Sequence, residues 1–334
     1  MRLIIDAFGG DHAPLEVLKG CAMAREIYPE VTYLLAGDTE KIRKTAQENG
    51  ISLEKMEILD APDVITMEVH PREIMGKYKN SSMAVGLKAL AEGKGDAFLS
   101  AGNTGALVVG STLFVKRIKG IKRAALATVM PAMKGAFMLI DCGANVDCEA
   151  EYLQQFGIMG SIYMNKVVGV KNPRVGLANV GTEDIKGGAL QQEAFGLLKD
   201  SPIHFIGNIE ARDIPNGVAD VVVADGFTGN VIIKLYEGVA MMLMKSIKGI
   251  FYTNWKTKFG AMLLKKEMYA LKKKMDYNEY GGAPLLGIAK PVFKAHGSSG
   301  ARAFCSAIGV TKKCVEGNVI GEITDALAQV KREK

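Results

Sequence analysis

Two short stretches of the sequence share an arrangement of residues that could bind an anion. Both "SAGNTGA" (100–106) and "ADGFTGN" (224–230) read Gly-x-Thr-Gly, and each follows an apolar run. Glycine lets the backbone approach a ligand closely, and the N–H groups that open a helix attract negative charge. These turns are therefore candidate anion-binding sites. The alternative is that Gly, Asn and Thr serve only turn geometry and helix capping.

Three further glycine-rich turns follow other apolar runs: "DAFGGDHAP" (6–14), "DCGANVD" (141–147) and "NVGTEDIKGG" (179–188). One such turn is ordinary, but five of them favour a shared site. Ligands of α/β proteins bind beyond the carboxyl ends of parallel strands, where these turns would lie. The residues predicted to bind phosphate or substrate are Asp6, Gly9, Gly10, Asp11, Asn103, Thr104, Gly105, Asn145, Thr182, Glu183, Asp225, Thr228, Gly229 and His296.

Three residues in these turns are predicted to be catalytic. Lys186 could neutralise a phosphate as a point charge, although a surface lysine is the plain alternative. Asn230 could hold phosphate or stabilise an oxyanion, or it could simply cap a helix. His12 could act as a general base or a phosphate donor, and His296 could place a second imidazole in the site.

Several classes of enzyme lose support from motifs that the sequence lacks. It has neither the G-x-G-x-x-G fingerprint of dinucleotide binding nor the G-x-x-x-x-G-K-[ST] loop of nucleoside triphosphatases. It also lacks a G-x-S-x-G nucleophile elbow, so a covalent intermediate is not indicated. The four histidines lie far apart and no CxxC pair exists, which argues against a metal site. We therefore expect no metal and no cofactor, and orthophosphate is a plausible anion.

The elements that must position these turns can be read from short apolar runs. The runs predict strands at 3–6, 33–38, 97–103, 125–131, 137–145, 174–184, 204–208 and 220–226. They are apolar at successive positions, which is typical of parallel strands buried on both faces. The runs predicted to be helical between them are 15–27, 41–49, 82–92, 105–118, 150–167 and 188–199. This alternation predicts a doubly wound α/β fold with a largely parallel sheet.

The segment 238–275 differs from the rest of the chain. Residues 231–275 hold ten lysines, no arginine and two glutamates, a net charge of +8, whereas the whole chain carries +6. Apolar residues recur there at helical spacing, which predicts an amphipathic helical hairpin suited to a membrane surface or a partner groove. The alternative is a hairpin packed on the core or across a dimer. Nucleic acid is disfavoured because no arginine is present.

The hairpin also predicts where the chain would meet a membrane. The residues expected to contact the bilayer are Ile250, Phe251, Trp255, Phe259 and Leu263. No uninterrupted apolar run reaches the ~18 residues that a spanning helix needs. The chain opens directly on a strand without a signal peptide, and its five cysteines are odd in number and unpaired in sequence. A cytosolic protein with reduced thiols is therefore expected.

These motifs together resemble a known family. "DAFGGDHAP", "SAGNTGAL", "DCGANVD", "NVGTEDIKG", "VVVADGFTGN" and "KAHGSS" (294–299) occur in order and resemble the bacterial acyl-ACP:phosphate acyltransferases, the PlsX family of phospholipid synthesis. The resemblance implies one Rossmann-like α/β/α domain over 1–334, with the helical hairpin inserted at about 238–275. By motif, the family's lysine and asparagine fall on Lys186 and Asn230.

The resemblance also implies an activity and partners. The expected reaction transfers a long-chain fatty acyl group from acyl-carrier protein to orthophosphate, without a covalent enzyme intermediate. The expected protein is a cytoplasmic homodimer that attaches peripherally to the inner face of the plasma membrane. There it would supply the membrane-bound glycerol-phosphate acyltransferase. Alternatives are a phosphotransacetylase-like transfer from acyl-CoA, a dehydrogenase of related fold, and a non-catalytic membrane scaffold.

Overall fold

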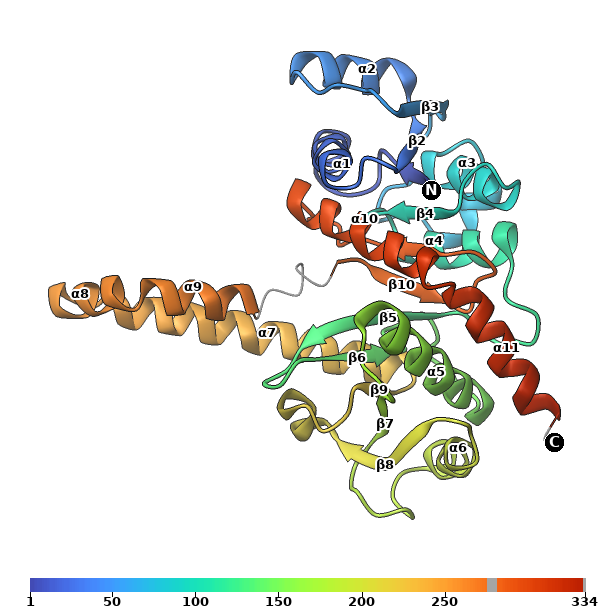
Figure 1. Ribbon diagram of the computed structural model, residues 1–334, viewed down its shortest axis with the longest axis vertical. Helices are drawn as coiled ribbons and strands as arrows, with labels where there is room; N and C mark the ends of the chain where they lie inside the picture. The colour runs from blue at the N-terminus through green and yellow to red at the C-terminus, as the bar shows by residue number, and fades with distance from the viewer. Residues whose placement is uncertain (275–280, 333–334) are drawn as a thin grey trace.

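The computed structural model describes residues 1–274 and 281–332, and it places a single twisted sheet at the centre of the molecule (Figure 1). Its strand order is β3-β2-β1-β4-β11-β10-β5-β6-β9-β7-β8. The strands are β1 (Arg2–Asp6), β2 (Thr32–Gly37), β3 (Met56–Asp60), β4 (Ala97–Ser100), β5 (Ala125–Pro131), β6 (Ala136–Ile140), β7 (Arg174–Asn179), β8 (His204–Glu210), β9 (Val221–Val223), β10 (Ala283–Leu286) and β11 (Val292–Lys294).

The sheet is largely parallel, as the sequence predicts, but its direction changes at the centre. The pairs β10·β11, β10·β5 and β5·β6 are antiparallel, and the other seven pairs are parallel. Three successive reversals make the strands of the β6–β8 half run opposite to those of the β1–β4 half. The five glycine-rich turns therefore do not share one sheet edge. They belong to two halves that meet at β10 and β5.

Burial explains why these segments form strands. All four residues of β4 and all three of β9 are buried, as expected for strands covered on both faces. The sequence did not predict β3, β10 and β11. The last two are four and three residues long, and β10 contains Pro284, which usually argues against a central strand.

Helices cover both faces of the sheet and make three layers (Figure 1). One face carries a continuous core with residues from α1, α5, α6, α10 and α11, and the other face carries two separate clusters. Of these two, one packs under α3 and α4 and the other under the start of α7. The helices are α1 (Leu15–Ile27), α2 (Thr39–Glu48), α3 (Ser82–Ala91), α4 (Thr104–Gly110), α5 (Ala150–Tyr163), α6 (Ala189–Lys199), α7 (Gly226–Phe251), α8 (Trp255–Leu263), α9 (Lys265–Lys274), α10 (Ala301–Glu316) and α11 (Val319–Arg332).

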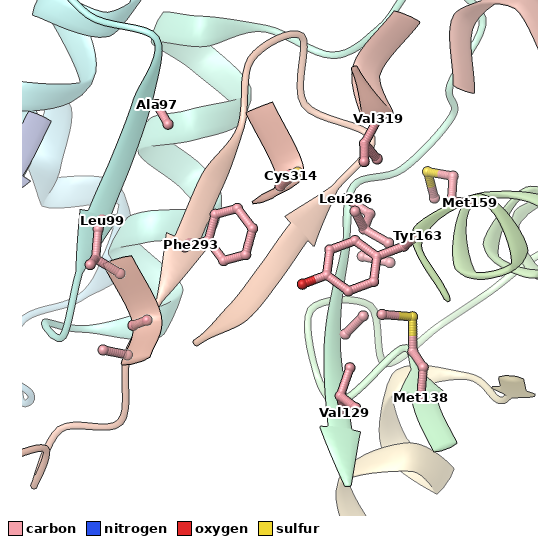
Figure 2. Packing of buried hydrophobic residues seen from close by; sticks show 14 of the residues in the cluster. Ala97, Leu99, Val129, Met138, Met159, Tyr163, Leu286, Phe293, Cys314 and Val319 are labelled. Atoms are coloured by element: carbon pink, nitrogen blue, oxygen red, sulfur yellow. The ribbon is translucent and has the colours of Figure 1, made fainter. Parts of the chain in front are cut away.

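The continuous core joins the two halves of the sheet. Figure 2 shows Leu99 and Phe293 from the first half in the same cluster as Leu286, Val129 and Met138 at the junction and beyond it. Tyr163 and Met159 of α5 pack over these strands, and Val319 of α11 closes the cluster. Since no boundary divides this core, the halves form one folded unit on this face.

The segment predicted to be a hairpin forms an arm that projects from the body (Figure 1). Helix α7 is buried only at its base, through Gly226, Gly229 and Ile233, and α8 and α9 run back beside its outer part. The turn lies at 252–254, directly before α8. Met275, the last residue of the segment predicted to form the hairpin, lies outside the described residues.

One helix among the described residues is long and apolar enough to cross a bilayer, which the search for uninterrupted apolar runs did not reveal. It is α7, whose most apolar 18-residue window has a mean hydropathy of 1.2 and is 11% buried. The base of α7 is nevertheless committed to the core, because Ile233 packs with residues of β6 and β9. Because its base is buried in this way, α7 is better suited to lie along a surface than to cross a membrane.

Candidate active site

A cleft of about 590 Å³ lies where the two halves of the sheet meet. Turns after β1, β4 and β11 form one wall, α7 and the turn after β6 form the other, and α10 contributes small residues. Its lining includes Asp11, Met67, Thr104, Leu126, Thr128, Cys142, Gly143, Asn230, Ile233, Lys234, Glu237, Lys294, Ala295, His296, Gly297, Ser298, Ser299, Ala303 and Ala307. Polar groups at the walls and apolar groups between them suit a ligand with a charged head and a greasy tail.

The first wall brings together three turns that are far apart in the sequence. The backbone N–H of Asp11 donates to the carbonyl of Gly297 at 2.8 Å, which joins the turn after β1 to the turn after β11. Gly10 has a φ of +101°, and a Cβ there would lie 2.9 Å from both Ala101 and the Gly297 carbonyl. Only glycine therefore fits at the point where the three turns touch.

The second wall is built on the start of α7. Asn230 lies in the second turn of this helix, and its exposed side chain packs over Gly143. Within the described part of the chain, no hydrogen bond engages the Asn230 amide. One turn later, Lys234 pairs with Glu237 at 3.8 Å. The amide is thus available to a ligand, whereas the neighbouring charges partly satisfy each other.

Buried Asp141 holds this wall in place. Its carboxylate accepts from the N–H groups of Leu126, Ala144 and Asn145 and from the Asn145 amide, at 2.7 to 3.2 Å. Burial raises the pKa of Asp141, and these hydrogen bonds act in the opposite direction. Asn145, predicted as a binding residue, is therefore occupied inside the protein, where its amide also reaches the carbonyl of Ala124 at 2.8 Å.

The glycines of "DGFTGN" allow helix α7 to approach that loop. The Gly226 N–H donates to the Asn145 carbonyl at 2.7 Å, and a Cβ on Gly226 would meet the same carbonyl. A Cβ on Gly229 would overlap the carbonyl oxygen of Asp141. Both glycines thus have a packing role, whatever they also do for a ligand.

Asn103 and Asp225, the residues directly before α4 and α7, act as helix caps. Asp225 accepts from the Thr228 N–H at 2.9 Å and from its hydroxyl at 2.7 Å. Asn103 accepts from the Ala106 N–H at 3.0 Å and donates to three carbonyls of the 66–69 loop. The repeated motif is thus explained in large part by capping and close packing, and Gly105 likewise leaves no space for a Cβ beside Pro71.

Asp6, another predicted binding residue, is buried beneath the turns and does not line the cleft. It accepts from the Ser100 hydroxyl at 2.6 Å and from the Phe8 N–H at 3.3 Å. Burial raises its pKa. Gly9 lies directly above, where a Cβ would be 2.7 Å from the Asp6 carboxylate. Asp6 therefore fastens the turn after β1 to the turn after β4.

Three of the predicted residues, Thr182, Glu183 and Lys186, lie on the loop after β7. In the sheet, β9 lies between β7 and β6. Lys186 is 45% exposed and faces Glu183 at 3.8 Å, and Thr182 is exposed on the same loop. None of them lines the cleft, and the same holds for the exposed His12. His296 does line it, with its Nδ1 2.8 Å from the Ser298 hydroxyl. The roles assigned to these residues remain predictions.

Sequence reasoning missed three charged residues that line the cleft, Lys234, Glu237 and Lys294, and of these only Lys294 is buried. Lys294 ends β11 and is 9% exposed. The signal was present, because Lys294 closes an apolar run and lies two residues before His296, which opens the His-Gly-Ser-Ser turn. It was overlooked because three strand residues are too few to be recognised as a strand.

A second hollow lies on the arm, between the outer half of α7 and α8–α9. Its floor is apolar, and its lining includes four lysines, Lys245, Lys248, Lys265 and Lys266. Four of the residues predicted to contact a membrane are well exposed, between 56% and 75%: Ile250, Trp255, Phe259 and Leu263. Phe251 is half-buried and lines the hollow.

A protein family and several known proteins match this chain over nearly its whole length. The family described as "Fatty acid synthesis protein" matches residues 1–322. A protein named phosphate acyltransferase from Caldanaerobacter subterraneus is 46% identical over 327 residues, covering 98% of this chain and 97% of the relative. Its counterpart from Clostridium acetobutylicum is 44% identical and covers 99% of this chain and 100% of the relative. A phosphotransacetylase structure from Streptococcus pyogenes aligns with a TM-score of 0.64 at 16% identity, covering 95% of this chain and 94% of that one, which indicates a shared fold.

Proposed function

Because the chain belongs to the family of fatty acid synthesis proteins that contains the phosphate acyltransferases, we propose that it transfers a long-chain fatty acyl group from acyl-carrier protein to orthophosphate. The chain is an acyltransferase, and phosphate takes part in its reaction. The acyl phosphate formed would serve phospholipid synthesis, through a membrane-bound acyltransferase that passes the acyl group to glycerol phosphate.

The observation that carries this proposal is the composition of the cleft. Its polar lining includes Asn230, Lys294 and the His296 turn, which suit a phosphate and a thioester carbonyl. The apolar part, with Leu126, Ile233 and the alanines of α10, suits the first carbons of an acyl chain. A cleft that received only a small polar acyl donor would not need this apolar surface.

The chemistry needs no nucleophile from the protein. A phosphate oxygen attacks the thioester carbonyl, a C–O bond forms, the C–S bond breaks, and the departing thiolate takes up the proton that phosphate loses. Cys142 lies in the cleft wall, but burial and the nearby Asp141 raise the pKa of its thiol to about 12. It therefore stays protonated at neutral pH, which favours direct attack by phosphate over an acyl-cysteine intermediate.

The protein then contributes positioning and charge stabilisation. The Asn230 amide would donate to the carbonyl oxygen as it becomes an oxyanion. Lys186 would assist with phosphate if the loop after β7 closes over the cleft. His12, on the turn after β1, would serve the departing thiolate if its side chain turns into the cleft.

An activity assay with matched donors tests the function. The protein is incubated with phosphate and either palmitoyl-ACP or palmitoyl-CoA, and acyl phosphate is trapped with hydroxylamine. We expect product with palmitoyl-ACP and little with palmitoyl-CoA. Product from the CoA donor alone would instead support the phosphotransacetylase-like alternative, which the shared fold makes relevant. No product from either donor would refute the proposed reaction.

The exposed arm supports peripheral membrane attachment from the cytoplasm. Trp255 and Phe259 are one helical turn apart on α8 and are 75% and 56% exposed. Lysines surround this apolar surface, which suits the headgroups of an anionic inner leaflet. An acyl chain leaving the cleft would enter such a membrane without crossing water.

Removing the two aromatic side chains should release the protein from lipid. We expect Trp255→Ala/Phe259→Ala to lower co-sedimentation with phosphatidylglycerol-containing vesicles at least severalfold, because two large apolar groups no longer enter the bilayer. Raising the salt concentration should weaken binding of the unmodified protein, since the lysine contribution is screened. Ile27→Ala, which removes an exposed apolar residue from α1, is the control. Equal vesicle binding by the double variant and the control would contradict the proposed membrane role of the arm.

A homodimer would account for the apolar stripe along the base of α7. Phe227, Val231 and Leu235 recur every four residues and are 64%, 50% and 66% exposed. An exposed apolar stripe of this kind is typical of an interface. Sedimentation equilibrium of the unmodified chain measures the assembly directly, and a monomer at micromolar concentration would contradict the proposal.

A further inference from the structure

Lys294 lies near the middle of the sheet and lines the first wall of the cleft. It is the last residue of β11, between the parallel strand β4 and the antiparallel strand β10, and it pairs in register with Ser100 and Ala283. Only 9% of its surface is exposed, and that surface faces the cleft. A lysine buried to this degree is uncommon unless a partner stabilises its charge.

The contacts of the Lys294 ammonium leave its charge without a direct counterion. Nζ donates to the carbonyl oxygens of Ala101 at 3.1 Å and Ala295 at 2.5 Å. Both acceptors are neutral, and an ammonium has three donors, so one remains for a further partner. Across residues 1–274 and 281–332, no ion pair involves Nζ, and the acids that act on it, Asp6 and Asp11, do so only at longer range.

The electrostatic setting favours an anion at this point. Burial lowers the pKa of Lys294 to about 8, and the charges of Asp6 and Asp11 oppose this shift only in part. Asp6, on β1, is itself a weak counterion because burial raises its own pKa. Asp11 lies on the same cleft wall and is exposed. A buried cation that is incompletely compensated is stabilised by any anion that reaches it.

We propose that the Lys294 ammonium binds the phosphate substrate directly, with its third N–H donating to a phosphate oxygen. This inference rests on the proposed function and assigns it a catalytic residue in the cleft itself, whereas Lys186 lies on a loop that does not line the cleft. The ammonium keeps its proton throughout. It holds phosphate beside Asn230 and the thioester, while the carbonyls of Ala101 and Ala295 fix its position.

The proposal makes activity and stability respond oppositely to alkaline pH. In the folded protein Lys294 loses its proton near pH 8, whereas in the unfolded chain it keeps the proton up to about pH 10.5. Between these two pH values the unfolded state therefore binds more protons than the folded state. The contribution of Lys294 to the free energy of unfolding thus rises with pH over this range. Phosphate binding weakens over the same range, because the cation disappears. Loss of activity above pH 8 would therefore not reflect unfolding.

Two variants separate this role from a purely structural one. Lys294→Met removes the charge but keeps most of the length of the side chain, and replacing a buried charge with an apolar group usually preserves folding. Lys290→Met makes the same change near the opposite end of β11, away from the cleft. We expect Lys294→Met to raise the KM for phosphate by about 10- to 100-fold, the loss of one charge-assisted hydrogen bond. The KM for palmitoyl-ACP and all parameters of Lys290→Met should stay near those of the unmodified enzyme.

Binding of phosphate without an acyl donor provides an independent readout. Phosphate should raise the Tm of the unmodified protein and of Lys290→Met but not that of Lys294→Met. An unchanged phosphate KM in an active Lys294→Met enzyme would overturn the inference and leave the proposed function standing. A protein that forms no acyl phosphate would refute the function, and the Tm shift would still decide whether Lys294 binds phosphate. If Lys294→Met fails to fold, the pH dependence of the phosphate KM of the unmodified enzyme tests the inference instead. This KM must rise with pH above about 8, and a constant KM would contradict the role of Lys294.

Discussion

Replacing Gly229 with alanine should destabilise the protein by about 3 kcal/mol or more, although alanine is the better helix former. Gly229 lies in the first turn of α7, where a Cβ would overlap the carbonyl oxygen of Asp141. The obstacle is backbone and cannot rotate away. Asp141 is itself held by hydrogen bonds to Leu126, Ala144 and Asn145, so relief would require moving the helix or breaking that network.

The same helix supplies the control. Gly238 lies further along α7 and is exposed, and a Cβ added there would have no atom within 4 Å. Gly238→Ala should therefore stabilise the protein by up to about 1 kcal/mol through helix propensity alone. Urea unfolding of both variants measures the difference. Equal midpoints for Gly229→Ala and the unmodified protein would show that α7 does not sit this close to the Asp141 loop.

The local pattern of the sequence predicts most of the sheet, because its strands are continuous apolar runs. Eight of the eleven strands coincide with such runs, and α1 begins and ends where the pattern places it. The antiparallel turnover at β10 could not be predicted. It depends on Leu285 and Leu286 pairing with Leu126 and Ala125, a contact between segments about 160 residues apart whose short strands carry no periodicity.

That one tertiary feature decides which predicted residues share a site. With all strands parallel, the turns carrying Lys186, Asn145 and Asn103 would lie side by side. The reversal instead brings Asn230 and Gly143 opposite Thr104 and the His296 turn. The Lys186 loop follows β7, which is parallel to β9, and does not line the cleft. Residue types at strand ends therefore pointed to several loops that line the cleft, but the arrangement of those loops was a property of the whole sheet.

Capping explains why so many polar turn residues turned out to be occupied. Asn103 and Asp225 would serve equally well as ligand donors or as helix caps when only the sequence is known. Their side chains are engaged by Ala106 and Thr228 at 3.0 Å or less. Asn230 is different because it lies beyond the cap, in the second turn of α7, where its side chain lines the cleft.

Replacing Asn230 should produce the largest loss of activity among substitutions that leave the fold intact. We expect Asn230→Ala to lower kcat/KM by about 10²- to 10³-fold, the usual effect of losing one oxyanion donor. The fold should tolerate it, because the side chain is exposed and alanine suits the interior of α7. Gly238→Ala, further along α7 and outside the cleft, should behave like the unmodified enzyme. Asn230→Asp, which removes the amide donors at constant shape, should be at least as impaired as Asn230→Ala.

Lys186→Ala in the same assay decides where the reaction takes place. A loss of about 2–4 kcal/mol of transition-state stabilisation is expected if Lys186 reaches phosphate during turnover, and this requires the loop after β7 to move toward Asn230. The Lys186 side chain is 45% exposed and pairs with Glu183 at 3.8 Å. The loop itself is held by hydrogen bonds from the Asn179 and Asn208 amides to the carbonyls of Lys186 and Glu183, so this movement must break them. Non-additive effects in the Lys186→Ala/Asn230→Ala double variant would place both side chains on one transition state. Near-normal turnover by Lys186→Ala would remove that loop from the mechanism, and an active Asn230→Ala enzyme would move the reaction out of the cleft altogether.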